Sequence, residues 1–183
     1  SMGGSDSQAF DMIRDADGNL YITGYCSDGP TQDLVICRLN SVGFIDETFG
    51  NDGFVKTDLG HDETGTSILF QEDGKILVLG HVMYNNGQSD MILCRYHANG
   101  SPDYSFSNTG RIVKDLNASS IDMPRGLALH QGKILIASYA YNSNPNDDDA
   151  LVLAQFNLDG SSDLNFGVSG YSIHNGFSLN GSL

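Results

Sequence analysis

The chain has 183 residues, 39% of them hydrophobic, and its 23 acidic and 9 basic side chains give a formal net charge of −14. A charge of this sign and size repels phosphate backbones and anionic headgroups, so we expect no nucleic-acid partner. No apolar run is long enough to cross a membrane, and we expect no membrane insertion.

A long composite motif occurs three times along the chain. DGNLYITGY at 17–25 returns as DGKILVLGH at 73–81 and QGKILIASY at 131–139, and the offsets between copies run from 56 to 60 residues. Self-similarity at a fixed period is the sequence signature of a repeat architecture.

Each copy contains four apolar segments of strand length, separated by turn residues. The Asp-Gly that follows the first segment favours a tight hairpin, because glycine adopts the positive backbone angles that such turns need. We therefore predict four short strands per copy, at 8–14, 19–24, 33–39 and 54–59; at 67–71, 75–80, 90–96 and 111–116; and at 126–130, 133–138, 150–156 and 171–176.

The second and third strands of each copy are apolar on both faces. Ile76 and Val78 alternate with Leu77 and Leu79, so both faces of that strand should be buried between neighbouring sheets. Radially stacked four-stranded sheets form a β-propeller, whereas the repeats of a solenoid, the main alternative, are usually shorter and have fewer strands.

The fold predicted is thus all-β, a β-propeller-like array of three four-stranded antiparallel blades. We place the blades at 7–59, 60–116 and 117–176, after a lead-in at 1–6 whose SMGGS resembles a cloning remnant of a segment taken from a longer protein, and before a tail at 177–183. Propellers commonly have four to eight blades. Three blades are therefore either part of a larger ring or closed by self-association, and we favour a homo-oligomer, a dimer or trimer that completes a ring.

The motif as a whole resembles the bacterial delta-60 repeat. The resemblance lies in an apolar strand after DGK, an L-x-R strand and then DG-x-x-D-x-x-F-G-x-x-G, with departures at Ser107, Gln131 and Gln155. It implies propeller blades in a large exported or cell-surface bacterial protein, without assigned catalytic residues. We accordingly expect an extracellular or cell-surface location, although no signal peptide is visible.

The segment DETFGNDG at 46–53 has the composition of a calcium loop. Its copies, DYSFSNTG at 103–110 and DLNFGVSG at 163–170, keep only an acid, a phenylalanine and a glycine, so we interpret it as a turn and expect no cofactor. Calcium is the alternative, with Asp159 and Asp163 as the nearest match to its ligands and Asp147 and Asp149 in a second acidic group.

No catalytic motif accompanies the five histidines or the three cysteines. Cys37 and Cys94 occupy the repeat position that Ala154 fills in the third copy, which indicates small packing residues. Cys26 ends a strand, and we expect it to be buried as well. His61 and His81 could approach one another on one rim. We lean against an enzyme.

The loop between the second and third strands varies from copy to copy. It has 8 residues between Gly24 and Asp33, 9 between Gly80 and Asp90, and 10 between Ser138 and Asp149, and variable loops on a regular scaffold usually carry binding. We predict a non-enzymatic binding or adhesion module whose glycan or protein ligand contacts polar and aromatic loop residues. The alternatives are a hydrolase or lyase with an acidic site on the same rim and a purely structural spacer. The candidate ligand-binding residues are Tyr25, Asp28, His81, Tyr84, Asn85, Asn86, Tyr139, Tyr141 and Asn142.

Overall fold

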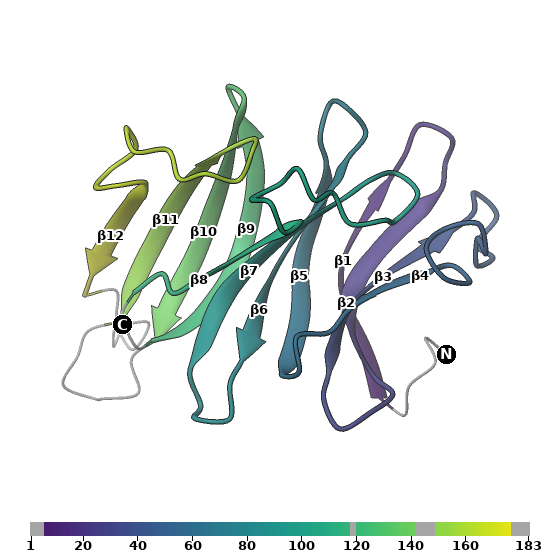
Figure 1. The fold of residues 1–183 in the computed structure, drawn as a ribbon, viewed down its shortest axis with the longest axis horizontal. Helices are drawn as coiled ribbons and strands as arrows, with labels where there is room; N and C mark the ends of the chain where they lie inside the picture. The colour runs from purple at the N-terminus through teal and green to yellow at the C-terminus, as the bar shows by residue number, and fades with distance from the viewer. Residues whose placement is uncertain (1–5, 118–119, 142–148, 177–183) are drawn as a thin grey trace, which may run out of the picture.

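The computed structural model describes residues 6–117, 120–141 and 149–176, and it contains strands and no helix within these ranges (Figure 1). The first blade consists of β1 (Asp6–Arg14), β2 (Leu20–Ser27), β3 (Asp33–Leu39) and β4 (Phe54–Thr57). The second consists of β5 (Asp62–Phe70), β6 (Ile76–Met83), β7 (Ser89–Tyr96) and β8 (Arg111–Lys114), and the third of β9 (Ile121–His130), β10 (Lys133–Tyr141), β11 (Ala150–Asn157) and β12 (Tyr171–Asn175).

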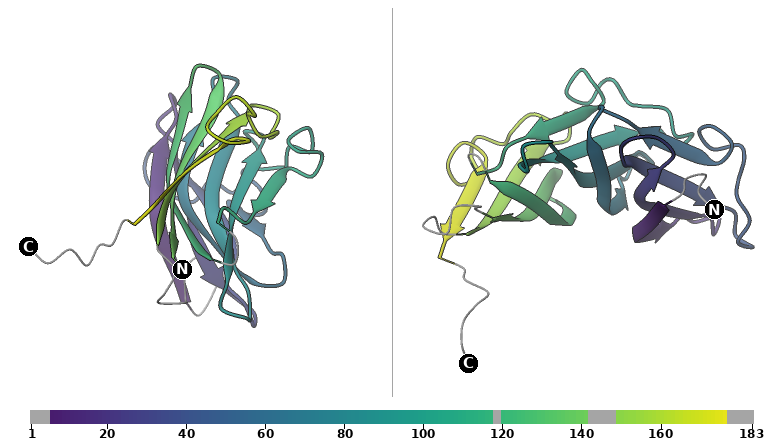
Figure 2. Two further views of the ribbon diagram at one scale, coloured as in Figure 1. Left: turned by 90° about the vertical axis from the view of Figure 1, so that its left-hand side faces the viewer. Right: turned by 90° about the horizontal axis from the view of Figure 1, so that it is seen from below.

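Every blade is an antiparallel meander in which consecutive strands are neighbours. A single parallel bridge, Ser89 to Ile121, joins the second blade to the third. The predicted all-β array of three four-stranded blades is confirmed, and the three sheets stand side by side in an open arc (Figure 2). The repeat boundaries stay predictions, because the strands do not define where one repeat ends.

The first strand of each blade is longer than predicted. β5 begins at Asp62 and not at Ser67, and β9 begins at Ile121 and not at Gly126. The added residues are mostly polar and lie before a shift in register, between Gly65 and Ser67 in β5, so no single apolar alternation runs through them. Pairing with the long β6 and β10 makes them strands.

The second blade is buried on both faces, as its alternation predicts. Ile76 and Val78 belong to an apolar cluster shared with Leu34 and Ile36 of the first blade. Leu77 and Leu79 belong to the other cluster, which contains residues of the third blade such as Ile134. Adjacent blades therefore share a core.

The segments 46–53, 103–110 and 163–170, here called the clasps, also join the blades. The Phe49 ring of the first clasp is fully buried beside Gly100 of the second blade, and the Phe106 ring of the second clasp is fully buried beside Gly160 of the third. Backbone hydrogen bonds add to each contact, from Gly50 N to the carbonyl of Asn99 at 2.9 Å and from Ser107 N to that of Asp159 at 2.8 Å. What the sequence predicted as a turn is thus also an interblade joint.

At the two ends of the arc, the corresponding phenylalanine and glycine have no adjacent blade among the described residues. Phe166 of the third clasp is only half-buried. Gly43, which corresponds to Gly100 and Gly160, has no described atom within 4 Å of the position that a Cβ would take. The array therefore ends in a phenylalanine on one side and an open glycine on the other.

Candidate functional site

The candidate site lies on the edge that carries the β2–β3 and β6–β7 connections, residues 28–32 and 84–88. This edge, the loop rim, is the lower edge in Figure 1. A hollow of about 340 Å³ opens on it between the second and third blades, lined by Tyr84, Asn86, Gln88, Asp90, Asp115 and Ser120. It brings together two of the predicted ligand-binding residues, Tyr84 and Asn86.

Tight turn geometry holds these side chains in place. Tyr84 N donates to the carbonyl of Gln88 at 2.9 Å, and the Asn86 side chain accepts from Gln88 N at 3.0 Å. The Tyr84 hydroxyl donates to Asp90 Oδ2 at 2.8 Å. Burial, and then this hydrogen bond, raise the pKa of Tyr84 to about 12. Tyr84 is therefore a fixed neutral donor that presents its ring beside amide groups.

The other predicted ligand-binding residues of the first two blades are spread along the rim. Tyr25 donates to Asp6 at 3.3 Å, and Asp28 pairs with Lys56 at 2.7 Å. Asn85 is exposed in the same turn as Asn86. His81 instead lies on β6 opposite Thr64, and burial, followed by the charge of Arg125, lowers its pKa to about 4. His61 packs its ring on Tyr84 at 5.0 Å between centroids.

In the third blade, Tyr139 donates a hydrogen bond to Asp149, and Tyr141 is an exposed residue at the end of β10. Asn142 and Asp147 lie outside the described residues. Asp159 and Asp163 cap turns: Asp159 accepts from Ser161, and Asp163 accepts from Asn165 N and pairs with Lys133 at 3.1 Å.

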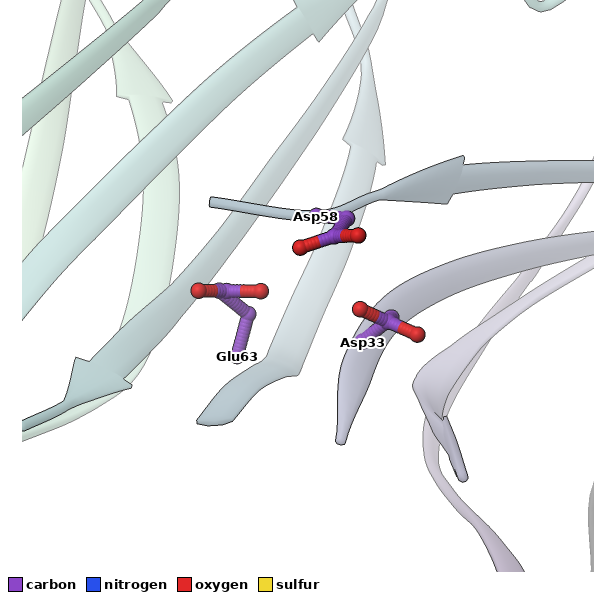
Figure 3. Close-up of side chains that lie close together, drawn as sticks. All are labelled: Asp33, Asp58 and Glu63. Atoms are coloured by element: carbon purple, nitrogen blue, oxygen red, sulfur yellow. The ribbon is translucent and has the colours of Figure 1, made fainter. Parts of the chain in front are cut away.

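Two groups of three carboxylates occupy equivalent places where adjacent blades meet on the loop rim. Asp33, Asp58 and Glu63 lie between the first and second blades (Figure 3), and Asp90, Asp115 and Asp122 lie between the second and third. Within each group the carboxylate oxygens offered as ligands are all within 4.8 Å of one another. Burial raises the pKa of Glu63 to about 7 and that of Asp122 to about 6.

Sequence reasoning missed both groups. Asp33 is the first residue of β3 and Asp90 the second residue of β7. The other acids lie in or beside the connections between blades, 25 or more residues further along the chain. Pairing of Leu34 with Thr57 and of Met91 with Lys114 brings the two aspartates of each group together within one blade. The packing of one blade on the next then adds Glu63 and Asp122. A possible signal was an acid near the start of the first strand in two copies, Glu63 and Asp122.

A comparison with known protein families identifies the family to which these blades belong. A family model described as a domain of unknown function, the DUF5122 beta-propeller, matches residues 16–49, 71–106 and 132–166, together more than half of the chain. The chain belongs to the DUF5122 beta-propeller family. A search of curated proteins finds no match. Among the described residues there is no helix long and apolar enough to cross a membrane.

The three DUF5122 matches extend from the first hairpin turn of each blade into its clasp. They include Tyr84 and Asp90 of the hollow but not Asp58, Glu63 or Asp122, which belong to the segments between matches. Asp33 and Asp90 lie within the matches, so each carboxylate group combines a matched segment with the segment that follows it.

A larger hollow, of about 690 Å³, lies on the opposite edge of this DUF5122 array, the clasp rim, between the second and third blades. Basic, acidic and apolar groups line it, among them Lys75, Arg95, His130 and Leu158. The buried Gln71 also lines it, and its Oε1 has no hydrogen-bond partner among the described residues. The sequence prediction placed function on the loop rim alone. The lysine of the DGK turn, Lys75, and the arginine of the L-x-R strand, Arg95, both line this second hollow and were its signal in the sequence.

Proposed function

We propose that the chain is a non-enzymatic binding and adhesion module, built from blades of the delta-60 type, in an exported bacterial surface protein. Its ligand, a glycan or a protein surface, contacts the loop rim. The observation that carries this proposal is the hollow where Tyr84, Asn86, Gln88 and Asp90 converge.

The chemistry of the hollow suits a hydroxyl-rich ligand. Aromatic faces pack against the apolar face of a sugar ring, and amides and carboxylates bond its hydroxyls. The Tyr84 ring is held by its bond to Asp90, and Asn86 and Gln88 supply amides from the same turn. A rigid aromatic next to fixed polar groups lowers the entropy lost on binding.

Glycan arrays test the proposal, with Tyr84→Ala and Tyr141→Ala as variants. We expect Tyr84→Ala to abolish binding and Tyr141→Ala to weaken it, while Tyr104→Ala, which changes an exposed tyrosine in the second clasp, leaves it unchanged. A protein microarray with the same variants tests the protein arm. Binding that survives Tyr84→Ala on both arrays would overturn the assignment of the hollow.

We further propose that the chain forms a homo-oligomer, a dimer or trimer, that completes the ring. The support is the pattern at the ends of the arc, where Phe166 has the repeat position of Phe49 and Phe106, and Gly43 has that of Gly100 and Gly160. Phe166 of one copy would pack beside Gly43 of the next in the manner of the internal joints, and head-to-tail contacts of this kind close a ring when the rotation fits.

The molar mass in solution, by light scattering, tests ring completion. We expect a multiple of the chain mass that falls toward one chain in Phe166→Ala. Leu164→Ala, a neighbouring exposed residue in the same clasp, is the matched control and should keep the assembly. A single chain at all concentrations would contradict self-association while leaving the glycan proposal standing.

One observation favours the enzymatic alternative. Asp122 has a raised pKa and lies beside two further carboxylates, Asp90 and Asp115. A carboxyl group that stays protonated in a buried site is what general acid catalysis uses. Hydrolase or lyase activity lost in Asp115→Asn would support this alternative. Stable assemblies without either ligand or activity would favour the structural spacer.

A further inference from the structure

The carboxylate group between the first two blades comes from three separate segments. Asp33 begins β3, Asp58 follows β4, and Glu63 is the second residue of β5. Figure 3 shows their carboxylates turned toward a common space, with oxygens from all three within 4.8 Å of one another. Asp33 and Glu63 are buried, and Asp58 is exposed. The group is therefore closed on the protein side and open toward the rim.

A second observation indicates that this group requires a further partner. Asp33 Oδ2 pairs with Lys56 Nζ at 2.8 Å, but Asp33 Oδ1 is buried and receives no hydrogen bond from any described residue. One oxygen of Asp33 points toward Asp58 and Glu63 (Figure 3). A buried carboxylate oxygen without a donor costs free energy, which a bound cation would offset.

The protein orients the other two carboxylates without neutralising them. Glu63 accepts from Leu59 N at 3.1 Å and His61 N at 3.2 Å, and Asp58 Oδ1 accepts from Gly60 N at 2.7 Å. Backbone amides fix the positions of the oxygens but carry no net charge. Among the described residues, Lys56 supplies the ion pair to this group, and it shares its ammonium with Asp28.

We propose that Asp33, Asp58 and Glu63 bind a divalent cation of the size of calcium. Calcium takes oxygen ligands at about 2.3–2.6 Å, so two ligands on opposite sides of the ion lie about 4.6–5.2 Å apart. Magnesium usually keeps several of its own waters and is seldom held by protein oxygens alone, so a site of three carboxylates suits calcium better. Water completes the coordination on the open side, where Asp58 is exposed. The ion ties β3 of the first blade to β5 of the second.

The equivalent group between the second and third blades does not meet the same test. Its carboxylates all accept hydrogen bonds: Asp90 from the Tyr84 hydroxyl, Asp115 from Asn117 N, and Asp122 from Leu116 N and Ser120. No oxygen in it is buried without a donor among the described residues. We assign no ion there.

Terbium luminescence tests the cation site. The chain has no tryptophan and 8 tyrosines, so tyrosine-sensitised emission from a bound Tb³⁺ should appear on titration and fall when Ca²⁺ competes. Calorimetry with Ca²⁺ then gives the number of ions bound. Both measurements are made on the full chain, and far-UV circular dichroism checks that each variant keeps its β structure.

Asp58→Asn is the test variant, because Asp58 is exposed and its change should leave the fold intact. We expect it to bind one ion fewer than the unchanged chain, or to bind that ion about tenfold or more weakly. Asp62→Asn is the matched control: it removes the same charge four residues along the chain, at the first residue of β5, which instead accepts from Gln32 N at 2.8 Å. Calcium binding should survive in this control.

Two results would overturn the proposal. One is an unchanged chain that gives neither sensitised emission nor binding heat. The other is an equal loss of binding in Asp58→Asn and Asp62→Asn, which would show that the ion responds only to the chain's overall negative charge. The site does not depend on the glycan proposal, and glycan binding without calcium binding would reject the site alone.

Discussion

The Phe106 ring of the second blade packs on Gly160 of the third blade so closely that a Cβ on Gly160 would lie 3.0 Å from ring atom Cε2. The same relationship joins Phe49 to Gly100, at 3.1 Å. The glycine of each repeat thus serves two purposes. It adopts a left-handed backbone angle in its own turn, and it leaves room for a ring from the preceding blade.

Gly160→Ala and Gly43→Ala should separate these two purposes. Both glycines have φ near +90°, so each change costs about 1–2 kcal/mol in the left-handed backbone. Gly160→Ala should cost about 1–3 kcal/mol more, because the Phe106 ring must move. Urea unfolding at a concentration where light scattering gives one chain checks this. Equal losses would mean that the ring contact contributes nothing to stability.

The arginine of the L-x-R strand should matter more in the second blade than in the first. Arg95 pairs with Asp103 at 2.8 Å with side chains 6% and 4% exposed, and its guanidinium lies 4.6 Å from the Phe106 ring centre. The corresponding Arg38 and Asp46 side chains are 14% and 20% exposed. Arg95→Gln removes the nearer of two cations from the buried Asp103, with Lys75 remaining at 3.6 Å, and should cost about 3 kcal/mol. Arg38→Gln should cost about 1 kcal/mol.

The pH dependence of the stability lost in Arg95→Gln tests whether the broken ion pair with Asp103 is its cause. Burial opposes ionisation of Asp103, but hydrogen bonds from Ser105 and the charges of Arg95 and Lys75 outweigh it and lower the pKa to about 2. The stability due to a carboxylate with a lowered pKa is present above its unfolded value, near 4, and is lost as the pH falls toward 2. The difference between Arg95→Gln and the unchanged chain should therefore shrink over this range. A difference that stays constant would indicate lost packing on Phe106.

The sequence predicted the blades well because their signal is local. Alternation at Ile76, Leu77, Val78 and Leu79 predicted burial on both faces, and the two shared cores confirm it. The beginning of β5 was wrong by five residues, since its polar start becomes a strand only by pairing with β6. The acid groups were missed because Asp33 and Glu63 meet through the packing of two blades, which no spacing within one repeat reveals.

Asp122 should make the protein less stable as the pH rises from about 4 to 6. Burial raises its pKa to about 6, and the charges of Asp115 and Asp90 act in the same direction, although Leu116 N and Ser120 donate to it. The folded state then binds more protons than the unfolded state across this window, so the unfolding free energy falls as the pH rises. Asp122→Asn should flatten that part of the curve relative to the unchanged chain. Parallel curves for the two proteins would show that Asp122 is ionised at its ordinary pKa.

All three thiols should be unreactive in the folded protein. Cys26, Cys37 and Cys94 are buried and free, and burial raises the pKa of each, that of Cys94 to about 11. Because the thiolate is the reactive form, a disulfide reagent such as Ellman's should titrate three thiols in urea and react only slowly in buffer. Cys26 should react first, since it lines a hollow of about 270 Å³ on the outer face of the first blade, beside Lys56. Cys26→Ala should remove this first phase and leave the other two thiols protected, whereas a fast phase that persists in the variant would place the accessible thiol at Cys37 or Cys94.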